Sequence, residues 1–319
     1  MPAVLPGGVE ARDNAGLSTP APTPSLFARH PAYKGIALMV FAVGCFAGMD
    51  TIAKYLSQWY PVPVIVWARY ALNLAVLSAF LLATGRLDVW RAKRPGIQVA
   101  RGFLLAGATL AYFTSIALMP LAEAASIGFV LPLFVAVLAV PMLGERLDMA
   151  RLIAIGVGLG GALMIVRPGT GVFTWVSLLP VLMALCNALY QIFTRMVSGV
   201  DRPYTSLFYS ALVGAILLSL LMPLYWQTPQ GWQHWALLVV VGTLATVGHL
   251  ALIRAYEYAT ASLLAPFIYT QLIWVMLLGW LLFGDFPDAW SLAGMAVITG
   301  SGLYIVNRQR LTAPRSPKA

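Results

Sequence analysis

Charged residues are scarce along almost the whole chain. Only 22 of the 273 residues from Gly35 to Asn307 are charged, and 60% of the 319 residues are hydrophobic. Soluble domains carry about 25% charged residues, so this stretch has too little charge to cover the surface of a water-soluble protein. The sequence therefore predicts an integral membrane protein.

Ten apolar stretches are each long enough to cross the hydrocarbon core of a bilayer as a helix, which takes about 20 residues. They are 35–56, 63–84, 97–119, 122–143, 150–167, 174–197, 203–225, 233–258, 261–283 and 289–307. Turn-forming residues separate most of them, for example Arg94-Pro95-Gly96. The breaks at Met119-Pro120-Leu121 and Ala259-Thr260-Ala261 are weaker, and without them the count would be eight. We expect an all-α membrane protein with ten transmembrane helices.

Basic residues indicate how the chain is oriented. With a cytoplasmic N-terminus, 17 of the 20 Lys and Arg residues fall on cytoplasmic loops and helix ends, and only Lys54, Arg69 and Arg167 do not. Cytoplasmic loops are enriched in basic residues, so we expect a multi-pass protein of a bacterial-type inner membrane with both termini in the cytoplasm. Residues 1–34, rich in Pro, Ala, Gly and Ser, are expected to form a disordered tail and not a signal peptide, and residues 308–319 a basic tail.

The sequence contains an internal repeat. Residues 114–167 align with residues 254–307 at an offset of 140 without a gap, and Gly144-Glu145 then overlies Gly284-Asp285. Matches at turn residues carry more weight than matches between apolar residues, which are common by chance. We therefore expect two five-helix halves. They are residues 35–167 and residues 174–307. Because five is odd, the second half would be inverted relative to the first, as in many secondary transporters.

Several motifs resemble those of the EamA-type members of the drug/metabolite transporter superfamily. They are Pro120-Leu121-Ala122-Glu123-Ala124-Ala125-Ser126, Leu131-Pro132-Leu133-Phe134, Leu143-Gly144-Glu145-Arg146-Leu147, and Asp50-x3-Lys54-Tyr55-Leu56 followed by Tyr60-Pro61 and Arg69. In the second half Asp285 replaces the usual Glu, and no Pro aligns with Pro132. The resemblance implies ten helices in two inverted halves around a central cavity, and transport of amino acids, nucleotide-like metabolites, cofactors or drugs.

The resemblance implies more about the activity than about its direction. Many similar proteins are exporters, and others import compounds such as S-adenosylmethionine or riboflavin. We expect a secondary transporter that moves a small polar or amphipathic metabolite by alternating access, and export is preferred over import. A non-transporting membrane sensor or assembly partner is the alternative from a different class.

Other classes of function lack their sequence signatures. No Walker-type, His-Glu-x-x-His or Gly-x-Ser-x-Gly motif occurs, so we expect neither ATP hydrolysis nor an enzyme, and no cofactor or metal site. The basic residues form no stripe interleaved with aromatic residues, which argues against a nucleic-acid partner. The expected partners are the substrate, the lipid bilayer and protons, and the protein could be a monomer or a homodimer.

Charged residues inside the expected spans are candidates for function, because a charge at the centre of a membrane helix costs about 2.5–3.5 kcal/mol on insertion scales. Asp50 and Lys54 lie four residues apart on one face of the first span, where they could pair. Arg69 lies at a similar depth in the second span. The three could form a structural ion cluster, or Lys54 and Arg69 could bind a carboxylate or phosphate. Asp50 is the leading candidate for proton coupling.

The eighth span carries His249, Arg254 and Glu257. His249 is either a hydrogen-bonded core residue or a proton carrier. Glu257 is three residues from Arg254 near the cytoplasmic end, so the two either form a surface ion pair or contribute to proton coupling.

Polar uncharged residues form a second group of candidates. Asn187, Tyr190, Gln191 and Thr194 follow the i, i+3, i+4, i+7 spacing of one helix face in the sixth span. Tyr112, Tyr269 and Gln271 could extend this polar wall, and Trp67 could stack on a planar substrate. Such side chains bind polar ligands without the desolvation cost of fixed charges, but they could equally form hydrogen bonds between helices.

Overall fold

A computed structural model describes residues 31–85, 87–144, 149–167, 174–259 and 261–312. These residues form twelve α-helices, α2 to α13, and two short 3-10 helices, with no β-strand among them. Glu145 of the repeat alignment, and most of both expected tails, lie outside the described residues. Helix α2 begins at Pro31, four residues before the expected start of the first span.

The helices of the first half follow the apolar stretches closely. They are α2 (Pro31–Leu56), α3 (Val62–Ala83), η1 (Leu87–Trp90), α4 (Pro95–Leu118), α5 (Leu121–Gly128), α6 (Leu131–Leu143) and α7 (Met149–Val166). Proline in the first turn begins α3 and α4, since its fixed φ suits that position and its missing N–H is not needed there. Gly144, with φ +70°, ends α6, because glycine adopts the left-handed conformation without strain.

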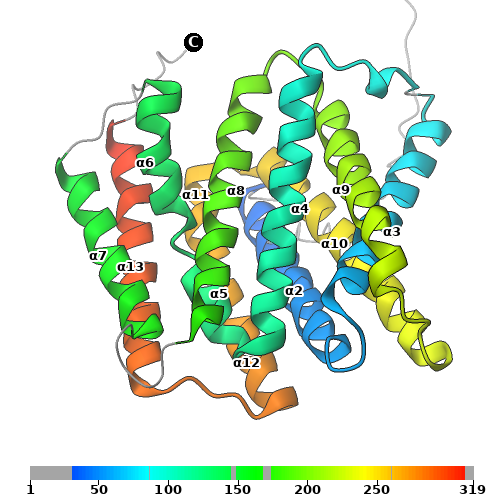
Figure 1. Cartoon of the computed structure of the whole chain (residues 1–319). Coiled ribbons are helices and arrows are strands. Elements are labelled where there is room, and N and C mark those ends of the chain that lie inside the picture. Colours follow the sequence, from blue (N-terminus) through cyan, green and yellow to red (C-terminus); the bar gives the residue numbers. More distant parts are fainter. Residues whose placement is uncertain (1–30, 86, 145–148, 168–173, 260, 313–319) are drawn as a thin grey trace, which may run out of the picture.

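The second half has a matching set of helices. They are η2 (Trp175–Ser177), α8 (Leu178–Val197), α9 (Pro203–Tyr225), α10 (Gly231–Tyr258), α11 (Ala261–Ile268), α12 (Thr270–Phe283) and α13 (Ala289–Thr312). Gly284, with φ +71°, ends α12 as Gly144 ends α6. Helices α6 and α12 end at opposite ends of the molecule (Figure 1).

Two of the expected continuous spans are interrupted. The stretch 122–143 is divided into α5 and α6 at Phe129-Val130, and the stretch 261–283 into α11 and α12 at Tyr269. Proline stands near both breaks: Pro132 in the first turn of α6 and Pro266 within α11. A proline inside a helix removes one backbone hydrogen bond and crowds the preceding turn, so each stretch forms two shorter helices.

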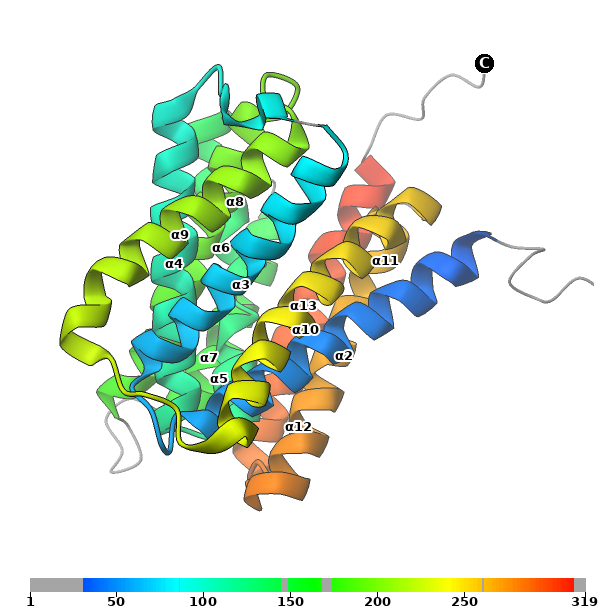
Figure 2. The same ribbon diagram turned by 90° about the vertical axis from the view of Figure 1, so that its right-hand side faces the viewer.

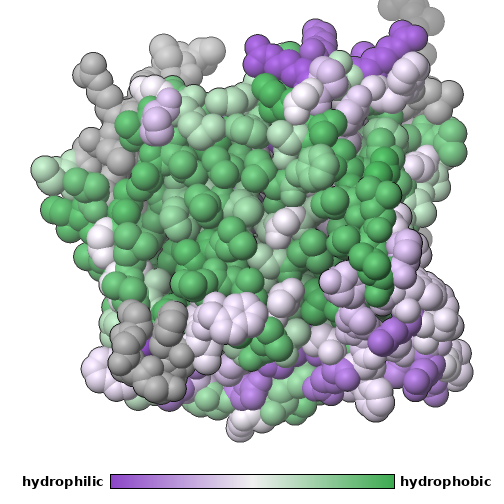
Figure 3. Space-filling model, in the orientation of Figure 1, coloured by the Kyte–Doolittle hydropathy of each residue, from purple (hydrophilic) through white to green (hydrophobic). Residues whose placement is uncertain are grey.

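The surface is that of a multi-pass membrane protein. Within the described residues, eight stretches are long and apolar enough to span a membrane, the α5–α6 pair among them, and Leu152–Val166 of α7 is a shorter apolar helix. Figure 3 shows a broad hydrophobic band between two more hydrophilic ends. Leu220 and Leu224 are 71% and 79% exposed, as side chains that face lipid would be.

Helices from the two halves alternate in space. Helix α2 packs against α10, α4 against α8, α3 against α9, and α7 against α13. The last of these pairs lies to one side of the molecule in Figure 1, and Figure 2 shows α2 running beside α10. The core of the protein is therefore shared between the two halves.

Glycine allows α7 and α13 to approach closely. A Cβ added to Gly161 would lie 2.9 Å from the carbonyl oxygen of Gly294, and Gly158 lies against Ser301 and Leu133. Gly160 and Gly300 of the same two helices take no part in this contact, since neither has a neighbour within 4 Å of an added Cβ. Both lie on a different helix face from the contact.

Candidate functional site

A cavity of about 640 Å³ lies between the two halves. Eight of the residues proposed for function border it: Asp50, Arg69 and Tyr112 from the first half, and Asn187, Gln191, His249, Tyr269 and Gln271 from the second half. Most of the remaining lining is apolar and comes from α4, α5 and α6. Ligand sites of this kind, an apolar cavity with a few convergent polar groups, commonly occupy 300–1,000 Å³.

Asp50 of α2 is buried at the border of the cavity, with 2% of its surface exposed. Its Oδ2 accepts hydrogen bonds from the Tyr112 hydroxyl at 3.1 Å and, at a longer 3.4 Å, from Gln271 Nε2. Its Oδ1 is also buried and has no hydrogen-bond partner. Buried polar atoms are almost always hydrogen-bonded, so this oxygen is an unused acceptor beside a cavity.

Arg69 of α3 contributes a cation to the same cavity. Its Nη1 donates to Thr109 Oγ1 at 3.0 Å, and its guanidinium lies over the rings of Tyr70 and Phe113 at 5.5 and 5.8 Å. No carboxylate in the described part of the chain lies within ion-pair distance of it. Arginine has five N–H donors, so most of them remain for a ligand.

The aromatic part of the lining is ordered by ring contacts. Tyr269, at the break between α11 and α12, stacks on Phe129 with ring centroids 4.9 Å apart. His249 meets the ring of Phe46 edge-on at 4.9 Å, and its Nδ1 lies 2.7 Å from the carbonyl oxygen of Ala245. A carbonyl oxygen only accepts, so Nδ1 donates, and Nε2 is the nitrogen left for other contacts.

The polar stripe of α8, formed by Asn187, Tyr190, Gln191 and Thr194, is divided between two environments. Asn187 and Gln191 face the cavity, and Arg195, one turn further on, borders it as well. Tyr190 and Thr194 instead turn to α4, where they contact Arg101. Arg195 was not among the predicted binding residues, although it continues the i, i+4 spacing of Asn187 and Gln191.

Four predicted site residues lie outside the cavity lining. Lys54 does not pair with Asp50; its Nζ lies 3.0 Å from Asp285 Oδ2 and donates to the carbonyl oxygen of Met119 at 2.8 Å. Glu257 forms an exposed ion pair with Arg254 at 3.0 Å.

Tyr190 and Trp67 are the other two. The Tyr190 hydroxyl accepts a hydrogen bond from Arg101 at 3.3 Å. Trp67 Nε1 donates to Ser219 Oγ at 2.9 Å, and its ring meets Trp226 edge-on, beside an apolar groove between α3 and α10.

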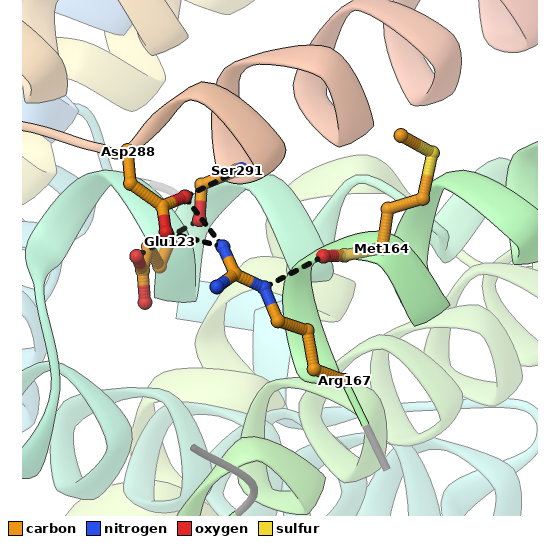
Figure 4. Close-up of polar contacts among 5 residues, drawn as sticks. All are labelled: Glu123, Met164, Arg167, Asp288 and Ser291. Carbon is orange, nitrogen blue, oxygen red and sulfur yellow. Dashed lines mark hydrogen bonds and ion pairs between the residues drawn. The ribbon is translucent and has the colours of Figure 1, made fainter. Parts of the chain in front are cut away.

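A polar cluster joins the two halves at the end of the molecule where α12 ends and α13 begins. Its members are Lys54, Glu123, Arg167, Asp285, Asp288 and Ser291. Besides the Lys54–Asp285 pair, the Ser291 hydroxyl donates to Glu123 Oε1 at 3.0 Å, and Arg167 forms an ion pair with Asp288 (Figure 4). The hydrogen bond from Arg167, with that from the Ser291 backbone N–H, lowers the pKa of Asp288 to about 2. The Lys54–Asp285, Ser291–Glu123 and Arg167–Asp288 contacts each link a first-half residue to a second-half residue.

A second inter-half network lies at the opposite end and was missed by the sequence analysis. Arg101 of α4, treated there as a marker of orientation, is only 2% exposed. It donates to Thr194 Oγ1 at 2.9 Å, to the Tyr190 hydroxyl and to Gln98 Oε1. Gln98 in turn donates to Asp201 Oδ2 at 2.9 Å. Partial burial raises the pKa of Asp201, but the hydrogen bonds from Gln98 and from the Lys93 backbone N–H outweigh it and lower the pKa.

The comparisons with known proteins point to one family. The model of the EamA-like transporter family matches residues 33–167 and again residues 174–308. The S-adenosylmethionine uptake transporter of Rickettsia felis is 27% identical over 281 residues, which cover 88% of this chain and 95% of that protein. The riboflavin transporter of Vibrio cholerae is 29% identical, covering 87% and 94%, and the pseudopaline exporter of Pseudomonas aeruginosa is 29% identical, covering 83% and 93%.

The fold also has a counterpart among solved structures. One crystal structure superposes with a TM-score of 0.60 over 88% of this chain and 99% of its own, at 20% sequence identity. At that identity the likeness concerns the fold alone.

Proposed function

Because the chain belongs to the EamA-like transporter family, we propose that it is a secondary transporter that moves a small polar or amphipathic metabolite across the inner membrane by alternating access. The observation that carries this proposal is the cavity itself, which takes its polar lining from both halves of the chain. A site built from two bodies can be exposed on either side when the bodies rock against each other.

The two ends of the cavity differ in a way that supports alternating access. The lining reaches Leu143 and Arg195, near the last residues of α6 and α8. At the opposite end of the molecule, the polar cluster ties α2 to the segment between α12 and α13, and Lys54 there is 12% exposed. The conformation therefore fits a state that is closed at the cluster and accessible from the end where α6 and α8 terminate. With both termini in the cytoplasm, that accessible end is the cytoplasmic one.

The packing of the helices supports two inverted five-helix repeats. The α2–α10 contact has a counterpart in α4–α8, α3–α10 in α4–α9, and α2–α12 in α6–α8. Here α2 is equivalent to α8, α3 to α9, α4 to α10 and α6 to α12. Each of these contacts is thus matched by a contact between the equivalent helices, as a two-fold axis in the membrane plane requires. In this proposal α7 and α13 complete the count of ten spans.

The direction of transport is proposed to be export, and import is the alternative. Relatives of both kinds exist, since the Rickettsia protein is named for uptake and the Pseudomonas protein for export. We propose Asp50 as the proton-coupling residue, because it is the carboxylate that borders the cavity in the described part of the chain.

The decisive experiment compares metabolites inside and outside cells that contain or lack the protein. Transport predicts a compound that accumulates on one side only with the wild type, and that side gives the direction. Arg69→Ala should abolish the difference for an anionic or zwitterionic substrate, whereas Glu257→Gln, on an exposed helix face, should preserve it. Equal metabolite profiles with wild-type protein and no protein, in cells and in vesicles of both orientations, would overturn the proposal and favour a sensor or assembly partner.

A further inference from the structure

We propose that residues 88–94, which lie between α3 and α4 and which we call the basic segment, bind the head group of an anionic phospholipid at the membrane surface. In the proposed orientation this surface is the cytoplasmic one. The proposal concerns the bilayer around the protein, so it goes beyond the transported substrate and does not depend on it.

Three cations of the basic segment have no carboxylate partner. Arg91, Lys93 and Arg94 are exposed, and none of them takes part in an ion pair among the described residues. Arg94 Nη1 donates to the carbonyl oxygen of Met196 at 3.2 Å, which leaves its charge without a counterion. The guanidinium of Arg91 lies over the ring of Trp90, with Cζ 5.4 Å from the ring centroid. Three positive charges within four residues can therefore bind an external anion.

The carboxylates beside the basic segment already have partners. Asp88 forms an ion pair with Arg202. Asp201 accepts hydrogen bonds from the backbone N–H of Lys93 at 2.6 Å and from Gln98 Nε2 at 2.9 Å. These two carboxylates stand against Arg202 and the three cations of the segment, so the charges are +4 and −2 and their sum is +2. The region thus keeps an excess of positive charge that an anionic head group would neutralise.

An exposed apolar surface adjoins these cations. Trp90 is 61% exposed, and Phe80 and Leu82, in the last turn of α3, are exposed as well. The ring of Tyr204, near the start of α9, lies 6.0 Å from that of Phe80. Figure 3 shows hydrophilic residues at the top of the view directly above the hydrophobic band. Tryptophan and tyrosine favour the boundary between lipid and water, so a phospholipid fits here with its phosphate beside the cations and its chains along α3.

Contacts with the second half of the chain hold the basic segment in place. The Tyr209 hydroxyl donates to the carbonyl oxygen of Trp90 at 2.8 Å, and other contacts of the segment reach Met196, Asp201 and Arg202. All four partners of the segment belong to α8, to α9 or to the turn between them. A ligand that binds the folded protein stabilises it, so a lipid bound here would strengthen the contact between the two halves.

Binding of short-chain lipids to the purified full-length protein in detergent tests the proposal. Dioctanoyl phosphatidylglycerol and dioctanoyl phosphatidylcholine have the same tails and the same phosphate, but only the first carries a net negative charge. Microscale thermophoresis should show that phosphatidylglycerol binds about tenfold or more tightly, and it should raise the melting temperature more. sn-Glycerol 3-phosphate, an anion without tails, should bind at least about tenfold more weakly than phosphatidylglycerol, because exposed charges alone are screened by salt.

Matched variants assign the preference to the basic segment. Arg91→Gln combined with Lys93→Gln should remove it, and Arg94 is kept because it also holds α8. Arg91→Lys combined with Lys93→Arg keeps both charges and should keep the preference. Lys34→Gln combined with Arg254→Gln removes two exposed cations near the start of α2 and the end of α10 and should also keep it. Size-exclusion profiles and melting temperatures show whether each variant is folded.

Four results would overturn the proposal. They are equal binding of the two lipids, an unchanged preference in the folded double glutamine variant of the segment, an equal loss in the Lys34 and Arg254 control, and binding of sn-glycerol 3-phosphate as tight as that of phosphatidylglycerol, which would indicate a site for free phosphate. Should the double variant not fold, Arg91→Gln and Lys93→Gln take its place singly. Each should weaken phosphatidylglycerol binding about fivefold, the usual contribution of one basic residue near an anionic surface.

Discussion

Lys54 in α2 forms an ion pair with Asp285, which follows α12 and lies 231 positions further along the chain; Nζ and Oδ2 are 3.0 Å apart. The same ammonium group donates to the carbonyl oxygen of Met119 at the end of α4. One side chain thus connects three helices at the end of the molecule that we propose to be closed.

The Lys54–Asp285 pair is predicted to stabilise this conformation. Because the two groups are in contact and largely shielded, the variants Lys54→Met and Asp285→Asn should not have additive effects. We expect a coupling energy on the order of 1 kcal/mol from a double-mutant cycle measured by thermal unfolding in detergent. The exposed pair Arg254–Glu257 provides the matched control, with a coupling near zero. Additive losses at Lys54 and Asp285 would contradict the assignment.

The contribution of Asp288 to stability is predicted to depend on pH. Its pKa is lowered to about 2 in the folded protein, below the ordinary value of about 3.9. Its ionised form is therefore stabilising at neutral pH, and that contribution is lost as the pH falls from about 4 toward 2.

Asp288→Asn removes the titrating group and so provides the comparison. The difference in melting temperature between wild type and this variant should be constant from pH 7 to 5 and should shrink below pH 4. The effect should be small, because the side chain is 54% exposed and solvent screens the pair. A difference that stays constant down to pH 3 would show that the Arg167 contact does not shift the titration.

Arg101 is predicted to be essential for the packing of α4 against α8. Its guanidinium is buried and donates to three side chains, so Arg101→Ala leaves these acceptors unsatisfied and a cavity behind. We expect a loss of about 2–4 kcal/mol in unfolding free energy. Arg202→Ala, at an exposed ion pair, should cost less than about 1 kcal/mol. Equal effects of the two substitutions would argue against a structural role for Arg101.

The contact between α7 and α13 offers a comparison between neighbouring glycines. Gly161→Ala places a methyl group 2.9 Å from the Gly294 carbonyl oxygen, so we expect a loss of about 1–3 kcal/mol from overpacking. Gly160→Ala meets no atom within 4 Å and should be neutral or stabilising by up to about 1 kcal/mol, since alanine favours helix. Thermal unfolding of the two variants measures both effects. The reverse order would place the helix contact elsewhere.

The helices could be predicted from the sequence because each apolar stretch must satisfy its backbone hydrogen bonds within itself in a membrane. The interruptions of the fourth and ninth stretches could not, because α5 and α6 are as apolar as the uninterrupted helices and a proline alone does not always end a helix. Pro132 and Pro266 stand near the two breaks, but a membrane helix can also accommodate a proline without ending.

The candidate site was predicted in part. Asp50, Arg69 and Asn187 were identified because charged and amide groups are rare in membrane helices. This signal can be recognised in the sequence without knowledge of the fold. The partner of Lys54 could not be derived, because helix spacing favours Asp50 and only the fold brings Asp285 closer. Tyr190 was misplaced for a similar reason: a polar stripe spans a wide face of a helix, and this one is shared between the cavity and Arg101.

The glycine contact between α7 and α13 has a mechanical consequence. Two backbones that touch at Gly161 and Gly294 have no layer of side chains between them that could rearrange. Among the described residues, none of α7 or α13 borders the cavity. In the rocking that we propose, the displacement would be smallest at this pair and would grow toward the helices that line the cavity, so the pair would act as the pivot.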